Sequence, residues 1–140
     1  MPTAIFPGRF DKLASIADFI RQAAKEAGLD EKDAYAVETA VDEACSNIID
    51  HAYGGEGRGN ITCSYEIDND RLTIILEDQG DPFDPNQVPE PDLSADLDHY
   101  QVGGLGLYFI RKLMDEVHFN FSPGKGNTLI MIKRKEPKVG

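Results

Sequence analysis

A run of apolar residues at helical spacing constrains the fold of this chain more than any other feature. Apolar side chains recur every three or four positions between residues 37 and 52, at Val37, Val41, Ala44, Ile48 and Ala52. This spacing predicts a helix with one apolar stripe, which must be buried against a second layer of structure. We expect Asp30 to cap the helix at its start, and the glycines at 54 and 55 follow its expected end.

A polar stripe lies beside the apolar one on the same predicted helix. It contains Glu43, Asn47, and then Asp50 or His51. Residues four apart lie above one another on a helix, so Glu43 and Asn47 project in the same direction. A carboxylate next to a carboxamide at the edge of a core can activate a proton and hold a hydrated cation. An isolated pair with this spacing is more often an ordinary solvated face, so the rest of the chain must decide between the two interpretations.

The second layer is supplied by segments in which apolar and polar residues alternate. Residues 60–67 and 71–77 predict two strands joined by a turn at residues 68–70, and residues 117–121 and 128–133 predict two more. A further helix is expected before the long one, capped by Asp11 and ended by Gly28. These elements predict an α+β fold in which about three helices cover one face of a mixed, mostly antiparallel sheet.

Composition and charge limit the function classes. A chain of 140 residues with 41% hydrophobic residues is expected to form one domain, residues 1–140. The net charge of −11 argues against nucleic acid or an anionic membrane as partner. The chain has no membrane-spanning apolar run and its first residues do not resemble a signal peptide, so a cytoplasmic location is expected. Cys45 and Cys63 lack metal-ligand spacing and are expected to be small buried apolar residues.

The segment from residue 81 to residue 102 has no periodic pattern. It contains four prolines, six carboxylates and no lysine or arginine. A loop of this length within a compact domain is typical of a lid or a binding loop. The basic residues near the end, 134–140, are expected to form a solvated tail.

Three further motifs, taken together, indicate a ligand-binding site. Asp78-x-Gly80 places a carboxylate at the end of a predicted strand, followed by a glycine that allows close approach to the backbone. Residues 103–106 form a glycine cluster at the start of a predicted helix, where free amides favour phosphate. In Gly124-x-Gly126-Asn127-Thr128 a turn enters a strand whose first hydroxyl is expected to face the same pocket. Each motif alone is weak, since a plain turn or loop explains it equally well.

Their order and spacing resemble the N, G1, G2 and G3 boxes of the GHKL ATPase superfamily. Within this superfamily, the chain is most similar in sequence to the stand-alone anti-sigma-factor and serine-kinase branch, which is RsbW- and SpoIIAB-like. The similarity lies in residues 42–47, 51–53, 78–80, 103–107 and 113–117. The resemblance covers about Phe6 to Lys133. It implies a Bergerat fold, an α+β sandwich, that binds ATP with Mg²⁺ under a lid.

The resemblance also implies roles for single residues. Glu43 would be the general base that polarises the attacking hydroxyl, and Asn47 would coordinate Mg²⁺. Asp78 would accept a hydrogen bond from the adenine amino group, with Thr128 nearby through water. Gly80 would let the base lie against the backbone, and Phe83 would wall the pocket. Amides would be offered to the phosphates by Gly103, Gly104, Leu105, Gly106 and Leu107.

The resemblance implies two protein partners: a small anti-anti-sigma (antagonist) protein, phosphorylated on a serine, and a sigma factor that is sequestered. It also allows a homodimer. One departure concerns charge, because residues 99–102, His-Tyr-Gln-Val, lack the basic residue that close relatives often carry there. The charge on the γ-phosphoryl group in transit would then need Lys125, Arg111 or an arginine of the partner.

Three interpretations remain open at this point. The first is an ATP-dependent serine kinase and anti-sigma factor in a partner-switching system. The second is an ATP-binding anti-sigma module with weak or no kinase activity, which the acidic lid favours. The third is an interaction domain whose boxes no longer bind nucleotide. The intact Glu43, Asn47, Asp78 and glycines argue against the third, and the retained Glu43 favours the first over the second.

Overall fold

The computed structural model describes residues 1–82 and 102–135, without the side chains of residues 102–106. The predicted lid (81–102) therefore lies almost entirely outside the described residues, as do Phe83 and most of the predicted tail. Among the residues that are described, no helix is long and apolar enough to cross a membrane.

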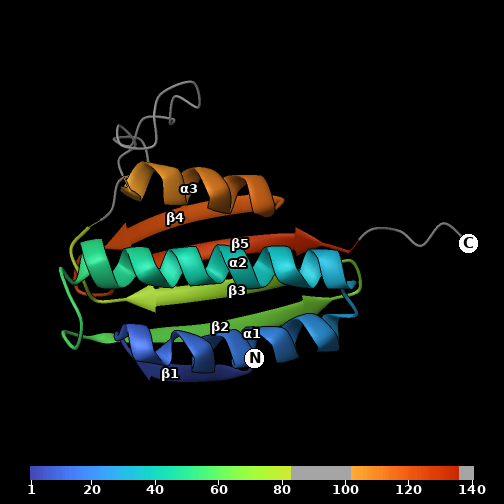
Figure 1. Cartoon of the computed structure of the whole chain (residues 1–140), viewed down its shortest axis with the longest axis horizontal. Coiled ribbons are helices and arrows are strands. Elements are labelled where there is room, and N and C mark those ends of the chain that lie inside the picture. The colour runs from blue at the N-terminus through green and yellow to red at the C-terminus, as the bar shows by residue number, and fades with distance from the viewer. Residues whose placement is uncertain (83–101, 136–140) are drawn as a thin grey trace, which may run out of the picture.

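Five strands and three α-helices make up the described part of the chain (Figure 1). In chain order they are β1 (Thr3–Pro7), α1 (Leu13–Ala27), α2 (Glu31–Asn47), β2 (Asn60–Asp68), β3 (Arg71–Asp78), α3 (Val102–Leu113), β4 (Glu116–Ser122) and β5 (Gly126–Arg134). A 3-10 turn, η1 (Phe10–Lys12), precedes α1, and a π-helical turn, η2 (Ile48–Ala52), follows α2. The predicted helices and strands are thus confirmed, most of them with ends shifted by one or two residues.

The sheet has the strand order β1-β2-β3-β5-β4, and each of its four pairings is antiparallel. The α+β prediction is confirmed, whereas the expectation of a mixed sheet is wrong. The three helices lie on one face, with α1 beside β1 and β2, α2 over the middle strands and α3 beside β4 (Figure 1). Strands β3 and β5 are neighbours in the sheet, although α3 and β4 lie between them in the sequence, and β4 is an edge strand.

The core lies between the sheet and the helices. The predicted stripe on α2 is buried at Val37, Val41 and Ala44 and continues into η2 at Ile48. Alternate residues of the strands, among them Leu76 and Met131, are buried on the sheet face that the helices cover. Burial of these apolar surfaces is the main force that holds α2 on the sheet.

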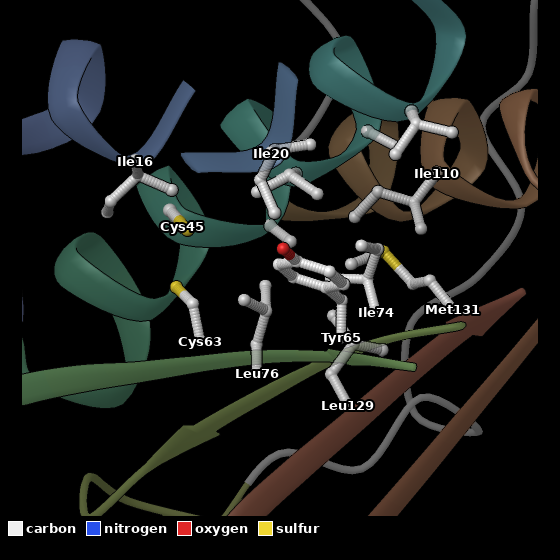
Figure 2. Close-up of a cluster of buried hydrophobic side chains, with 14 of the residues drawn as sticks. Ile16, Ile20, Cys45, Cys63, Tyr65, Ile74, Leu76, Ile110, Leu129 and Met131 are labelled. Atoms are coloured by element: carbon white, nitrogen blue, oxygen red, sulfur yellow. The ribbon is translucent and has the colours of Figure 1, made fainter. Parts of the chain in front are cut away.

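Both cysteines belong to this core. Cys45 of α2 and Cys63 of β2 are free thiols with no exposed surface, as expected. Figure 2 shows their sulfur atoms facing each other between helix and sheet. Hydrogen bonding to Cys63, together with burial, raises the pKa of the Cys45 thiol, so this thiol remains protonated and acts as a packing group.

The helix ends follow the predictions in two of three cases. Asp30 caps α2, its carboxylate accepting a hydrogen bond of 2.8 Å from the backbone N–H of Asp33. Gly28 ends α1 in the left-handed conformation, with φ of 76°. Asp11 does not cap α1, because it lies within η1 and its carboxylate pairs with Arg9.

The end of the long helix differs from the expected continuous α-helix. Directly after Asn47 the backbone changes to π-helical bonding, and the N–H of Tyr53 donates to the carbonyl of Ile48 at 2.9 Å. Such turns insert one extra residue per turn and often occur at functional sites. This one changes the direction of every side chain that follows Asn47.

Gly126, at the start of β5, provides a steric test of the fold. It has φ of 88°, and a β-carbon there would lie 2.0 Å from the carbonyl oxygen of Asp78. Gly124 has a similar φ of 82° but no atom within 4 Å of its β-carbon position.

We expect Gly124→Ala to lower the free energy of unfolding by about 1–2 kcal/mol, the cost of the backbone conformation alone. Gly126→Ala should lower it by more than about 3 kcal/mol, because strands β3 and β5 must move apart.

Urea unfolding of the two variants and the wild type measures this difference. Equal losses of stability would show that Asp78 and Gly126 are not in close contact.

Candidate functional site: a pocket between the end of β3 and helix α3

An open pocket lies where α2, η2 and α3 meet the ends of β3, β4 and β5. Its volume is about 670 Å³, including the space at its mouth. Its lining among the described residues is largely apolar, with a few polar groups: Ala44, Asn47, Ile48, His51, Ala52, Asp78, Asp81, Pro82, Leu107, Ile110, Phe119, Asn120, Asn127, Thr128 and Leu129. A concave apolar site with few polar groups is typical of a small-molecule site.

Asp78, the last residue of β3, is the buried carboxylate of this pocket and is only 4% exposed. Its Oδ1 accepts two hydrogen bonds of 2.9 Å, from the backbone N–H of Gly80 and from Nδ2 of Asn127. Its Oδ2 has no partner among the described residues. Burial raises the pKa of Asp78, and the two hydrogen bonds oppose that effect. The site therefore offers one carboxylate oxygen to a hydrogen-bond donor.

Asn127, which the sequence motif contained but for which no role was predicted, is the neighbour of Asp78 on β5. The two residues are register partners, so their side chains share one face of the sheet. Thr128 borders the pocket but lies opposite Glu77 and Asn120, on the face that alternation turns away from Asp78. The polar side chain that contacts Asp78 directly is thus Asn127, while Thr128 lines the pocket as predicted and its water-mediated role stays a prediction. The strand register, which sequence does not give, decides this.

Gly80 is required by a contact within the protein. A β-carbon at Gly80 would lie 2.5 Å from the carbonyl carbon and oxygen of Ala52, at the end of η2. The next residue, Asp81, donates its backbone N–H to the same carbonyl at 2.8 Å. The end of η2 therefore already requires a glycine at this position, and the predicted approach of an adenine base to the backbone of Gly80 stays a prediction.

Tyr53 connects the segments around the pocket, a role that the sequence did not suggest. Its hydroxyl donates to the carbonyl of Asn60 at 2.6 Å and accepts the backbone N–H of Gln79 at 2.9 Å. Its ring lies over Gly59, where a β-carbon would be 2.3 Å from the ring. The side chain of Gln79 in turn donates to the carbonyl of Lys125 at 2.6 Å. The residue after Asp78 is thus fixed to η2 and to the β4–β5 turn.

Glu43 and Asn47 lie one turn apart on α2, as predicted. Asn47 is the last residue of the α-helix and lines the pocket, whereas Glu43 is partly buried and is not among the lining residues. Neither side chain has a hydrogen bond or an ion pair with another described residue. Both are therefore free to bind a ligand group, and Asn47 is the nearer of the two to the pocket.

The glycine cluster lies in the first turns of α3. The helix begins at Val102, so Gly103, Gly104, Leu105 and Gly106 are helical residues, and Leu107 is buried and lines the pocket. The first amides of a helix have no intrahelical partner and favour anions. These amides precede Leu107, the first lining residue of α3, in the chain.

Lysine and arginine are absent from the described lining of the pocket. Arg111 and Lys125 are exposed and lie outside it. The described residues also contain no cluster of three His, Cys, Asp or Glu side chains that would hold a metal ion by itself. Asn47 fits the need of Mg²⁺, because this ion takes one or two protein oxygens and otherwise keeps water and phosphate ligands.

The comparisons with known proteins agree with this architecture. Residues 6–133 match the histidine kinase-like ATPase domain, and the chain belongs to that family. Its similarity is to the branch predicted from the motifs, which confirms that prediction. It is 33% identical to the serine-protein kinase RsbW of Bacillus cereus over 131 residues, which cover 91% of this chain and 80% of that protein.

Two further similarities are shorter or more distant. The chain is 42% identical to the serine-protein kinase RsbW of Bacillus velezensis over 90 residues, which cover 61% of this chain and 56% of that protein. A crystal structure of the RsbU and RsbW domains of Rv1364c from Mycobacterium tuberculosis matches 96% of this chain and 32% of its own, with a TM-score of 0.65 and 16% identity. The last similarity supports the fold alone.

The environment of Asp78 predicts how stability depends on pH. A carboxyl group whose pKa is raised in the folded state stabilises the fold below its ordinary pKa, and this stability is lost as the pH rises through the folded-state pKa. We expect Asp78→Asn to be at least as thermally stable as the wild type at neutral pH. The difference should vanish at acidic pH, where Asp78 is protonated. Calorimetric melting temperatures across this range measure it, and Glu77→Gln on the exposed face is the matched control. A variant that is less stable than the wild type at neutral pH would contradict the burial effect.

Proposed function

We propose that this chain binds Mg-ATP in the pocket and transfers the γ-phosphoryl group to a serine of a small anti-anti-sigma protein. In the absence of that substrate it would sequester a sigma factor, and the family resemblance allows a homodimer. The observation on which this proposal chiefly rests is Asp78, a buried carboxylate with one open oxygen in an apolar pocket. Similarity to the serine-protein kinases RsbW supports the reaction type.

The base would lie against the apolar lining, with its amino group donating to Asp78 Oδ2. An exocyclic amine suits this site because the open oxygen is an acceptor without a described partner. The phosphates would extend toward the start of α3, where the first few amides, those before Gly106, have no intrahelical partner and offer donors. Phe83 would add to the wall of the pocket, and Gly80 would keep the end of β3 against η2.

The reaction would need Glu43 and Asn47. Glu43 would accept the proton of the serine hydroxyl as its oxygen bonds to the γ-phosphorus, and ADP would leave with the bridging oxygen. Asn47 would hold Mg²⁺, which supplies charge neutralisation to the phosphates. Positioning and charge neutralisation account for most of the catalysis of phosphoryl transfer.

A second candidate function is an ATP-binding anti-sigma module with weak or no kinase activity. The absence of lysine and arginine from the described lining favours it, because a cation near the transferred group contributes strongly to the rate. The two candidates differ in transfer and agree in binding. In the first, Lys125, Arg111 or an arginine of the partner would approach the γ-phosphoryl group.

Calorimetric titration of Mg-ATP into the wild type and into Asp78→Asn tests the binding proposal. An amide at position 78 would present a donor to the adenine amino group, so we expect affinity to fall by about tenfold or more. Glu77→Gln, a carboxylate one residue away on the exposed face, should bind as the wild type does. Absence of binding by the wild type, or equal binding by Asp78→Asn, would contradict the proposed site.

Transfer from γ-labelled ATP to a purified anti-anti-sigma protein tests the two residues of α2. Glu43→Gln should lose transfer by about 10²–10⁴-fold with unchanged Mg-ATP affinity, as expected for a general base. Asn47→Ala should weaken binding of Mg-ATP but not of ATP in chelator, because only the metal contact is removed. Asp42→Asn, an exposed neighbour, is the matched control. Loss of folding or of binding in Glu43→Gln would assign that residue a structural role, and a wild type without transfer would favour the second candidate.

A further inference from the structure

The two oxygens of the Asp78 carboxylate lie in different environments, and Asn127 is responsible for part of that difference. Oδ1 accepts two hydrogen bonds of 2.9 Å, one from Nδ2 of Asn127 and one from the N–H of Gly80. Nδ2 of Asn127 also donates to the carbonyl of Asp81 at 2.8 Å, which holds the amide in one orientation. Oδ2 has no partner among the described residues and belongs to a residue that lines the pocket. Oδ1 is thus used by the protein, and Oδ2 remains for a ligand.

This division has a consequence for the choice of base. An ionised carboxylate accepts hydrogen bonds only, so Oδ2 attracts an amino group and repels a carbonyl. A protonated carboxyl group has a donor as well and would tolerate a carbonyl. Burial favours the protonated form of Asp78, whereas the hydrogen bond from Asn127 favours the ionised form. The balance between these effects determines whether the pocket distinguishes a 6-aminopurine from a 6-oxopurine.

We propose that Asn127 is a positioning residue for base selectivity: it holds Asp78 ionised, with Oδ2 open to the exocyclic amino group of a 6-aminopurine nucleotide. This inference rests on the proposed function and goes beyond it. Asn127 acts through Asp78 and does not need to touch the nucleotide. The backbone supports the arrangement, since Asp78 and Asn127 are register partners and Gly126 allows the close approach of β5 to the carbonyl of Asp78.

The other titratable groups around Asp78 do not replace Asn127. His51 of η2 and Asp81, which follows β3, line the same pocket. Burial raises the pKa of the Tyr53 hydroxyl, and the nearby charge of Asp78 adds a smaller increase. None of the three side chains donates a hydrogen bond to the Asp78 carboxylate. The described lining residues contributed by α3 and β4 are uncharged: Leu107, Ile110, Phe119 and Asn120.

The test compares the affinities for ATP and for inosine triphosphate across pH, measured by calorimetry with the full chain. Both nucleotides have the same triphosphate, so the ratio of the two affinities cancels phosphate protonation, and comparing this ratio between the variants and the wild type cancels protonation of the base itself. In the wild type we expect a preference for ATP of about tenfold or more at neutral pH. That preference should decline as acid protonates Asp78. Asn127→Leu, similar in shape but without the donor, should lose the preference at a higher pH than the wild type.

Asn69→Leu makes the same chemical change in the β2–β3 turn, away from the pocket. This variant should lose the preference for ATP at the same pH as the wild type. A merely structural role of Asn127 would lower both affinities equally and leave the pH at which the preference is lost unchanged. That result would overturn the inference.

Asn127→Asp keeps the inference testable if Asn127→Leu does not fold. A second carboxylate beside Oδ1 disfavours ionisation of the pair, so the preference should again be lost at a higher pH. An unchanged titration of this variant would overturn the inference as well. A wild type that binds ATP and inosine triphosphate equally would preserve nucleotide binding but refute the role of Asn127. A wild type that binds neither nucleotide would refute the proposed function and the inference together.

Discussion

The pocket depends on close contacts that the end of strand β3 makes with η2 on one side and with β5 on the other, and two glycines make these contacts possible. Gly80 lies against the carbonyl of Ala52, and Gly126 lies against the carbonyl of Asp78. The hydroxyl of Tyr53 fixes Gln79 between these two contacts. Because the backbone segments touch, the carboxylate of Asp78 is buried beside the π-helical turn and faces a cavity. A side chain at Gly80 would push η2 away from the end of β3, and a side chain at Gly126 would separate β3 from β5.

The charge of the molecule makes phosphate binding an unusual task for it. The chain has a net charge of −11, and the described part of the pocket lining contains no lysine or arginine. Under the proposed function, attraction for a triphosphate would come from the amides at the start of α3, from the helix dipole and from Mg²⁺. Without its metal, ATP would be repelled by the overall charge. Because the described lining has no basic side chain, a side-chain cation near the transferred phosphoryl group would have to come from an exposed residue of this chain or from the protein substrate.

Sequence patterns predicted most of the elements because each pattern reflects a local rule. Alternation in residues 60–67 identifies a half-buried strand, the spacing of Val37, Val41 and Ala44 identifies a buried helix face, and Asp30 caps a helix through its own side chain. Two predictions failed, one because of a contact between near neighbours and one because of pairing between distant strands. Asp11 pairs with Arg9 within η1 and does not cap α1, and the sheet is antiparallel throughout. The π-helical turn after Asn47 has no local signal, since residues 48–52 continue the helical spacing.

The sequence by itself determined the class of this protein. The ATPase family follows from the order of the four motifs, which include the paired Glu43 and Asn47 and the carboxylate of Asp78. Only the tertiary structure decided which side chain meets Asp78. Asn127 and Thr128 are adjacent in the chain and both are polar, but a strand turns successive side chains to opposite faces. The register of β5 against β3, fixed by packing across the whole sheet, pairs Asn127 with Asp78 and turns Thr128, which also borders the pocket, to the opposite face of the sheet.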